Sequence, residues 1–509
     1  MEILASEIVG DLDRLSHLPE SIVHTILDYI HPSRGPPVDH VRMSVLSKTW
    51  FDLTASFPVL NFNIRIFTSR QSFFKYVEYT TSRFCHQNVT ADKLTFIATL
   101  SEPAEIDIVN QCFELLLKKG VKELFVDITH LPESPNPMPK PKYRLPDILL
   151  SVSALKYLDI LYCDLPSSLM VHGVKFESLI KLKLFKVHID DETIKYLATS
   201  CPLLQVFHIM SCYGFKSFCV YGHQNLQHVV IKYSTQVDRI DIEAPNLSHL
   251  WVQDVDDNVA PRMNLASCKK LTTVTYDGYY LPNDFLSNFP FIEILHLATD
   301  HDTCDNLKWS SHSLRALVID FDCDLEQIDF NTPNLVFFIY GSFSCTTANE
   351  CWSLLRDSTH LKACMRCYPD ECIDAIWFQK LRLFLEKKNG IKPLNLYIQM
   401  DQDFTDLEEI NAIELPPYEL EHVELQLDAH EELSPHMAFV DAVLWCCRPQ
   451  YLTIKSFFPL TDFEDVVKIV CEKLLQQEVQ GHTNIRIVSS HDGNTISFIK
   501  KEGIQEQAG

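Results

Sequence analysis

Histidine and cysteine gather in one stretch of the sequence, HLKACMRCYPDEC at residues 360–372. Thiolates and imidazole nitrogens are good Zn²⁺ ligands, and Cys364 and Cys367 have the C-x-x-C spacing of a zinc knuckle, with His360 and Cys372 close in sequence. A structural zinc site usually joins two knuckles, and no second C-x-x-C pair occurs in the sequence. Because the pair falls in a segment that we expect to be helical, we interpret these cysteines as buried thiols and predict no metal or cofactor.

Motifs of common enzyme classes are absent from the sequence. It has no glycine-rich phosphate loop, no H-E-x-x-H and no G-x-S-x-G, and glycine makes up only 13 of 509 residues. The histidines His208, His228, His249 and His296 are dispersed along the chain. We interpret them as surface or core residues rather than general bases, and we predict a non-catalytic protein.

Charge and hydropathy argue against two classes of partner. Lys and Arg total 44 against 68 Asp and Glu, a net charge of −24 that repels nucleic acid and anionic membranes. No run of 18 apolar residues occurs, and the N-terminal residues lack the basic region of a signal peptide. We therefore expect a protein of the cytoplasm or nucleus without nucleic-acid or membrane partners. Its 17 cysteines, odd in number and irregularly spaced, fit reduced thiols.

Apolar residues recur at offsets 0, 3 and 5 in ten successive segments. From Leu155 to Leu335, the first positions follow one another at intervals of 21 to 25 residues. This is the L-x-x-L-x-L pattern of leucine-rich repeats, whose stacked units share one core. The ten segments begin at Val121, Leu155, Leu179, Leu204, Leu226, Leu247, Leu271, Ile292, Leu314 and Leu335.

The repeats predict an α/β solenoid with parallel strands on its concave face and irregular or helical outer arcs. Cys163 and Cys212 lie eight residues after Leu155 and Leu204, where such repeats place Asn or Cys to satisfy backbone groups at a turn. In HIDDETIKYLATSCPLL, Asp190 and Asp191 can cap a short helix. The arcs DVDDNVAPRMNLASC and DFDCDLEQIDFNTPN lack helical periodicity, so we expect irregular or strand-like structure there.

After residue 345 the rhythm changes. Residues 349–390 are interpreted as mainly helical, ending at Gly390 after a Lys-rich turn. The repeat pattern then returns with wider spacing at Leu394, Val423 and Leu452. Residues 463–478 are expected to form a closing helix, followed by a hairpin of NIRIVSS and ISFIK, because the end of a solenoid must be covered.

An amphipathic helix precedes the repeats, in LPESIVHTILDYI at residues 18–30. Together, DRLSHLPESIVHTILDYI and VRMSVLSKTW resemble the F-box, in the form that heads plant F-box/leucine-rich-repeat proteins. The resulting division is an F-box domain at 11–58, a solenoid at 59–345, a helical insertion at 346–390, and C-terminal repeats with a cap at 391–509.

The resemblance implies the substrate-recognition subunit of an SCF (Skp–cullin–F-box) ubiquitin ligase. Such a subunit binds a Skp-type adaptor, and through it a cullin, and presents a protein substrate that the sequence does not identify. Carried over from the family, the adaptor contacts are Leu18, Pro19, Ile22, Ile26, Leu27, Val45, Leu46, Ser47 and Trp50.

Substrate binding is expected on the strand face, where the residues between the core positions point away from the core. There a basic corner gives way to exposed apolar residues, which are typical of a partner site unless the 349–390 segment covers them. The candidate residues are Lys181, Lys183, His208, Trp251, Ile294, His296, Val318, Phe337 and Ile339.

Two other functions remain open on the sequence. Thr49 stands where the family commonly has Arg, so the F-box could be degenerate and the protein a scaffold outside the ubiquitin pathway. Alternatively, the repeats could hold a small molecule, as they do in some plant relatives, which would require a convergent basic pocket. Loss of adaptor binding would favour the first alternative. A convergent basic ligand pocket would favour the second.

Overall fold

The computed structural model falls into two compact units, which are described separately. Unit 1 comprises residues 1–247 and 261–268, and unit 2 comprises 248–260 and 269–509. The structure describes residues 18–30, 42–130, 142–173, 176–234, 237–253, 260–278, 285–298, 307–320, 328–341, 363–368, 375–387, 394–400, 418–427, 433–456, 484–489 and 495–498.

Unit 1 begins with a small helical domain made of α2 (Glu20–Ile30) and α4 (Lys48–Ala55). Ser47 starts α4, since its side chain accepts a hydrogen bond from the backbone N–H of Trp50 at 3.2 Å. The apolar side chains of the two helices meet in a core of Val23, Leu27, Trp50 and Phe57.

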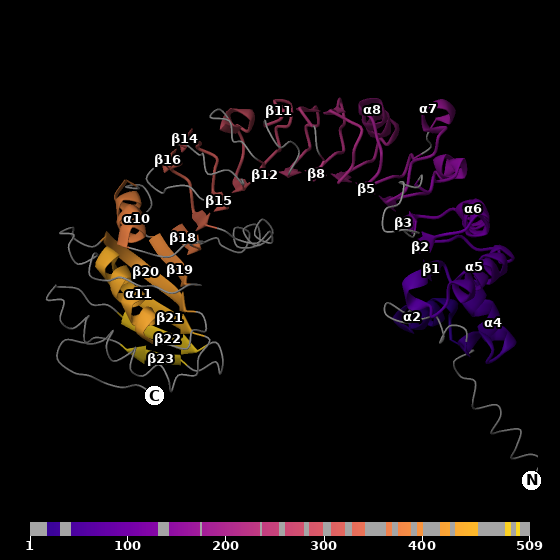
Figure 1. The fold of residues 1–509 in the computed structure, drawn as a ribbon, viewed down its shortest axis with the longest axis horizontal. Coiled ribbons are helices and arrows are strands. Elements are labelled where there is room, and N and C mark those ends of the chain that lie inside the picture. The colour runs from indigo at the N-terminus through magenta and orange to yellow at the C-terminus, as the bar shows by residue number, and fades with distance from the viewer. Residues whose placement is uncertain are drawn as a thin grey trace, which may run out of the picture. The chain divides into compact units, whose positions relative to one another are not determined.

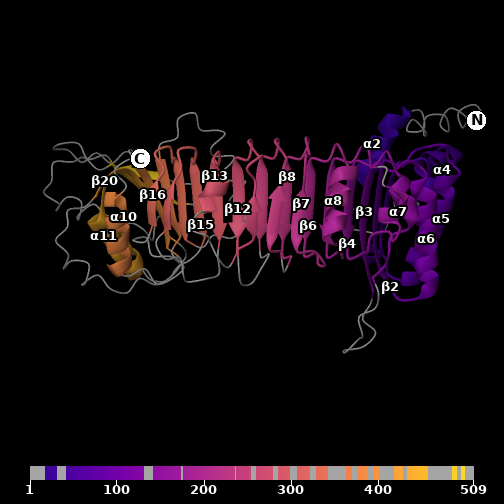
Figure 2. The same ribbon diagram turned by 90° about the horizontal axis from the view of Figure 1, so that it is seen from above.

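The remainder of unit 1 is a leucine-rich-repeat solenoid. Its main strands run parallel and pair in the order β1 (Val59–Asn63), β2 (Lys93–Leu100), β3 (Glu123–His130), β4 (Tyr157–Leu161), β5 (Lys181–Phe185), β6 (Val206–Met210) and β8 (His228–Lys232). In Figure 2, β3, β4, β6 and β8 are labelled along this row of strands.

The other side of these strands carries helices and a second, smaller sheet. The helices are α5 (Arg70–Cys85), α6 (Pro103–Leu117), α7 (Leu169–His172) and α8 (Asp191–Ser200), with 3-10 turns at Ile64–Ile66 and Asp147–Ser151. Figure 1 shows α5 and α6 outside β1, β2 and β3. The smaller sheet consists of β7 (Ser217–Val220), β9 (Arg239–Ile242) and β11 (Arg262–Asn264), in which β9 pairs with both neighbours.

Two expectations for the outer arcs are confirmed. Asp190 caps α8 by accepting the backbone N–H of Thr193 at 2.7 Å. The arcs without helical periodicity contain β11 in unit 1 and β16 (Ile328–Asn331) in unit 2.

The repeat strands begin at β1, within the solenoid expected from residue 59 but before Val121, where the sequence pattern first becomes visible. Leu60 and Phe62 of β1, and Leu94 and Phe96 of β2, are buried at the same strand positions as the later leucines. The intervening α5 and α6 make these repeats longer than those after residue 155, which obscures their spacing in the sequence.

The turn after each strand has a recurring geometry in unit 1. The residue following β4, β5, β6 and β8 has a positive φ of 50° to 60°, although none of the four is glycine. The next residue is buried, and in three repeats its side chain donates to a backbone carbonyl within the same turn. Those donors are Cys163 to Leu161 (3.2 Å), Cys212 to Met210 (3.5 Å) and Ser234 to Lys232 (3.1 Å).

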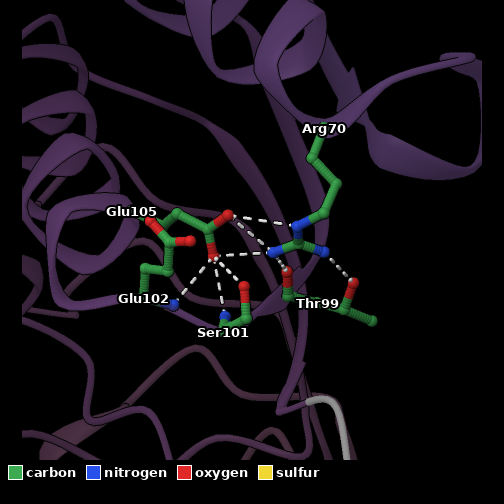
Figure 3. Close-up of polar contacts among 5 residues, drawn as sticks. All are labelled: Arg70, Thr99, Ser101, Glu102 and Glu105. Atoms are coloured by element: carbon green, nitrogen blue, oxygen red, sulfur yellow. Dashed lines mark hydrogen bonds and ion pairs between the residues drawn. The ribbon is translucent and has the colours of Figure 1, made fainter.

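A buried ionic network joins the first two repeat helices (Figure 3). The Arg70 guanidinium of α5 donates to the Glu105 carboxylate in α6 and to the Thr99 carbonyl, at 2.6–2.7 Å. The same carboxylate accepts the backbone N–H groups of Ser101 and Glu102 at the start of α6. Burial opposes ionisation of Glu105, but these hydrogen bonds outweigh it and hold the pKa of Glu105 below its ordinary value.

Unit 2 continues the repeats. Its main strands run parallel, from β10 (His249–Gln253) through β12 (Thr273–Asp277), β13 (Ile294–Ala298), β15 (Ala316–Asp320), β17 (Phe337–Gly341), β18 (Ala363–Tyr368), β19 (Leu394–Met400), β20 (Tyr418–Leu427) and β21 (Cys447–Ser456) to β22 (Asn484–Ser489). The last strand, β23 (Thr495–Phe498), pairs antiparallel with β22, which confirms the expected hairpin.

Shorter elements complete unit 2. A second parallel pair joins β14 (Leu307–Ser310) to β16. The helices are α10 (Ala375–Lys387) and α11 (Leu433–Cys446), with a 3-10 turn at Phe285–Asn288. The closing helix expected at 463–478 lies outside the described residues.

The prediction of a mainly helical insertion at 346–390 is wrong for residues 363–368. These form β18, which pairs with β17 on one side and β19 on the other and therefore belongs to the repeat ladder. Helix α10 follows as the outer arc of this repeat. The C-x-x-C pair thus lies on a strand, where Cys367 is buried, and not on a helix. Its β-branched residues are few, which is why the segment did not resemble a strand in sequence.

Helix α11 was not anticipated. Its sequence, LSPHMAFVDAVLWC, is apolar around much of its circumference, and Phe439, Val440, Val443 and Leu444 are all buried. A helix that is covered on most sides shows no single apolar stripe, so the helical periodicity on which sequence analysis depends is missing.

Buried thiols account for most of the described cysteines. Ten cysteines within the described ranges are free, and all but Cys85 are buried. Burial raises the pKa of Cys112, Cys163 and Cys201 to about 12, so these sulfurs stay protonated and unreactive. The part of the chain that the structure describes contains no cluster of three or more His, Cys, Asp or Glu placed to hold a metal. It also contains no helix with the length and hydropathy needed to cross a bilayer.

Candidate partner-binding surfaces

The helical domain at the start of unit 1 exposes apolar side chains that its own core does not use. Ile22 on α2 is 47% exposed, and Val45 and Leu46, just before α4, are 79% and 67% exposed. Pro19 at the start of α2 is exposed as well. We call Pro19, Ile22, Val45 and Leu46 the apolar F-box patch. Exposed large apolar residues on one small domain are typical of a docking surface.

Two of the expected adaptor contacts are buried within the helical domain itself. Leu27 is fully buried and Trp50 is only 3% exposed, and both pack with Val23 and Phe57 in the core of the helical domain. The sequence indicated one apolar face on α2, and that face serves partly as core and partly as exposed surface. Periodicity shows which residues share a face but does not show what covers it.

The other predicted contacts lie between these extremes. Leu18 is half-buried and packs against the core, and Ile26 is half-buried on α2. Ser47 is half-buried and uses its hydroxyl oxygen as the cap of α4. Leu18, Ile26 and Ser47 are therefore less exposed than the four residues of the apolar F-box patch.

One arginine ties the helical domain to the first repeat helix. Arg83 on α5 lies over the Phe51 ring of α4, with its guanidinium carbon 3.9 Å from the ring centroid. It also donates to the Thr54 hydroxyl at 2.6 Å and to the Phe51 carbonyl. Burial lowers the pKa of Arg83, and Tyr79 opposes that shift. The stacked and hydrogen-bonded guanidinium fixes α4 against the solenoid.

Three lysines and two histidines lie on the strand face between β5 and β8. Lys181 and Lys183 alternate along β5, and strand register places Lys183 beside His208 of β6. His228 and Lys232 of β8 lie on the same face. All five side chains are half-buried. We call Lys181, Lys183, His208, His228 and Lys232 the basic strand face.

The pKa values of these groups are shifted because their charges lie close together and their side chains are partly buried. Burial, the largest cause, and the neighbouring charges of Lys183, Lys181, His228 and Lys232 together lower the pKa of His208 to about 4. Burial also lowers the pKa of Lys183, which the nearby Asp159 carboxylate opposes. His208 is therefore neutral at pH 7, while the lysines carry the positive charge.

The expected apolar half of the substrate face is wrong. In unit 2, five predicted surface residues are at most 5% exposed, because β13, β15 and β17 are buried along both faces. His296 Nε2 lies 3.8 Å from the Asp320 carboxylate within this interior. Trp251 on β10 is half-buried. The five buried residues are Ile294, His296, Val318, Phe337 and Ile339.

The comparisons with known proteins agree with this architecture. Residues 109–283 match the family model described as FBD-associated F-box protein At5g56370, LRR repeats. The chain is 25% identical over 247 residues to F-box/LRR-repeat protein 25 of Arabidopsis thaliana, which covers 48% of this chain and 86% of that protein. It is 23% identical over 375 residues to the Arabidopsis F-box/FBD/LRR-repeat protein At1g78750, covering 65% of this chain and 78% of that protein.

The chain is similar to plant F-box/leucine-rich-repeat proteins. A further relative, the Arabidopsis F-box/FBD/LRR-repeat protein At5g56420, is 29% identical over 205 residues, 40% of this chain and 44% of that protein. Two other Arabidopsis F-box/LRR-repeat proteins are matched over only 38% of their own length. The family match lies in the repeats, from α6 onwards, and the sequence motif of the F-box precedes it.

The chain also has a group of partly exposed aromatic residues that the sequence did not point to. Aromatic side chains follow the strand ends of unit 1, where Tyr162 and Phe185 make an edge contact at 5.3 Å and Lys186 Nζ lies 5.2 Å from the Tyr162 ring centroid. Tyr213 is 43% exposed and lies under Lys142 Nζ at 4.7 Å. The signal was present in three of four repeats, as Tyr162, Lys186 and Tyr233 directly after the strand, with Ser211 in the fourth.

Proposed function

We propose that this F-box/LRR protein is the substrate-recognition subunit of an SCF ubiquitin ligase. The apolar F-box patch is the observation that carries the proposal, because it leaves a compact set of large apolar side chains open beside a well-packed core. A Skp-type adaptor would cover this patch and connect the chain to a cullin. The solenoid would hold the protein to be ubiquitinated, in the cytoplasm or nucleus.

No chemistry is required of the chain in this role. A ubiquitin-charged enzyme supplied by the ligase would perform the transfer, and this subunit would contribute proximity between that enzyme and the substrate. The names of the relatives support an F-box/LRR protein, and the role of a non-catalytic receptor follows from the family as a proposal for this chain.

Adaptor binding provides the test. We expect purified Skp-type adaptor to bind the full chain, and Ile22→Asp or Leu46→Asp to weaken binding at least tenfold, because each places a charge in an apolar interface. Val171→Asp is the matched control, since Val171 on α7 is 78% exposed outside the helical domain. Isothermal titration calorimetry would measure all four affinities.

Three results would contradict the proposal. They are absence of adaptor binding by the parent chain, retention of full affinity by both patch variants, and an equal loss in the Val171 control. Failure of the parent to bind would leave a repeat scaffold whose helical domain caps its own solenoid. Trp50→Ala is unsuitable for this test, because Trp50 lies in the core and its truncation would unfold the helical domain.

A further inference from the structure

The basic strand face is a local exception in an acidic protein. The chain carries a net charge of −24, yet three lysines lie on the strand face between β5 and β8. Among the strand-face positions of β4, β5, β6 and β8, the single acidic side chain is that of Asp159. The positive charge at this place is therefore in excess.

The neighbouring strands do not share this excess. On the face of β1 to β3, Arg65 lies 2.9 Å from Asp127, and Lys93 lies 3.9 Å from Glu123. Charges there are matched within the protein. On the basic strand face, one carboxylate, that of Asp159, faces three lysines; burial raises the pKa of Asp159, and the charges of Lys183 and Lys181 oppose that shift.

The spacing of the lysines fits an extended acidic chain. Lys181 and Lys183 are two residues apart on one strand, which separates same-face side chains by about 6.6–6.8 Å. Alternate carboxylates of an extended peptide have the same separation. Phe185 and Tyr162 border this face at the strand ends and offer apolar contact to the peptide's aliphatic or aromatic residues.

We propose that the basic strand face binds a protein segment rich in Asp and Glu, and that this segment is the feature by which the solenoid recognises its substrate. The argument rests on charge complementarity and on the register of β5, β6 and β8. Its identification as a substrate-recognition site rests on the proposed function, whereas binding of an acidic segment does not.

The test uses the full chain and a fluorescein-labelled deca-glutamate peptide, with deca-glutamine as the uncharged control. We expect the triple variant Lys181→Gln, Lys183→Gln, Lys232→Gln to weaken peptide binding at least tenfold in fluorescence anisotropy. The matched control, Lys118→Gln, Lys195→Gln, Lys216→Gln, changes the net charge equally at positions outside this face and should stay within twofold.

A gain of binding supplies a second readout that misfolding would not produce. Asp159→Asn removes the single strand-face carboxylate near Lys181 and Lys183, so we expect the deca-glutamate peptide to bind about threefold or more tightly. Raising the salt concentration should weaken binding by the parent and reduce the difference between it and the triple variant.

Several results would overturn the inference. They are failure of the peptide to bind, equal losses in the two triple variants, and binding of inositol hexakisphosphate with no binding of the peptide. Adaptor affinity is measured on the same samples, so the two proposals fail separately. If the chain binds the adaptor but not the peptide, the acidic-segment proposal is wrong and the ligase proposal stands. If the chain binds the peptide but not the adaptor, only the ligase proposal is wrong.

Discussion

His208 shows how neighbouring charges set the ionisation of a single side chain. It is half-buried on β6 among cations, and burial followed by Lys183 and Lys181 lowers its pKa to about 4. Burial also lowers the pKa of His223 and His228. An isolated histidine in the sequence gives no indication of this, because strand register brings these groups together.

The lowered pKa of His208 predicts a pH dependence of stability. Below about pH 6.5 the unfolded chain protonates this imidazole, while the folded chain keeps it neutral until about pH 4, so the unfolded state binds more protons. The free energy of unfolding should therefore fall as the pH drops through this window. His208→Gln should reduce that slope, measured by urea unfolding at pH 7.5, 5.5 and 4.5, and an unchanged slope would contradict the assignment.

At the scale of the element, each repeat depends on the turn that follows its strand. The residue after the strand adopts a positive φ without being glycine at Tyr162, Lys186, Ser211 and Tyr233. In three cases the side chain of the next, buried residue donates a hydrogen bond to a backbone carbonyl of the turn. The sequence indicated this role for Cys163 and Cys212. It did not indicate it for Ser234, because a serine hydroxyl replaces the thiol.

One glycine is required by close packing. Gly214 lies between β6 and β7 with a φ of 101°, and a Cβ there would lie 2.8 Å from the Ile189 carbonyl oxygen. Gly214→Ala should destabilise unit 1 by about 2–3 kcal/mol, through backbone strain and this contact. Gly222→Ala is the control, because its φ is 68° and no atom lies within 4 Å, so only about 1 kcal/mol is expected. Equal losses in chemical denaturation would contradict the role of the contact.

At the scale of the whole molecule, repeats and F-box have separate cores. The helical domain packs around Leu27 and Trp50, and each repeat packs its strand leucines beside those of adjacent repeats. In such a chain, stability is approximately a sum of local terms. Damage to a repeat should therefore leave a distant docking surface intact.

Two matched truncations test this separation. Leu297→Ala on β13 should lower the free energy of unfolding by about 2–5 kcal/mol, because Leu297 is 1% exposed, and should leave adaptor affinity within twofold. Leu27→Ala makes the same change in the F-box core and should lower both stability and adaptor affinity. Loss of adaptor binding in the Leu297 variant would show that the docking surface depends on the distant repeats.

The sequence by itself determined the repeat architecture and its register. Leu158, Leu182 and Phe207 are buried in adjacent strands because the period of the repeat and the alternation of a strand both derive from local geometry. The cap of α8 and the final hairpin were predictable for the same reason. Each depends on residues close together in the chain.

Tertiary structure alone decided what covers each face. Alternation predicted that Val318 and Ile339 point away from the leucine core, yet both are at most 2% exposed. The family resemblance grouped Trp50 and Ile22 as adaptor contacts, although Trp50 is in the core and Ile22 is on the surface. A side chain's exposure depends on segments distant in sequence, which local periodicity cannot report. The convergence of Lys181, Lys183 and Lys232 arises in the same way, because strand pairing brings together residues about 50 positions apart in the chain.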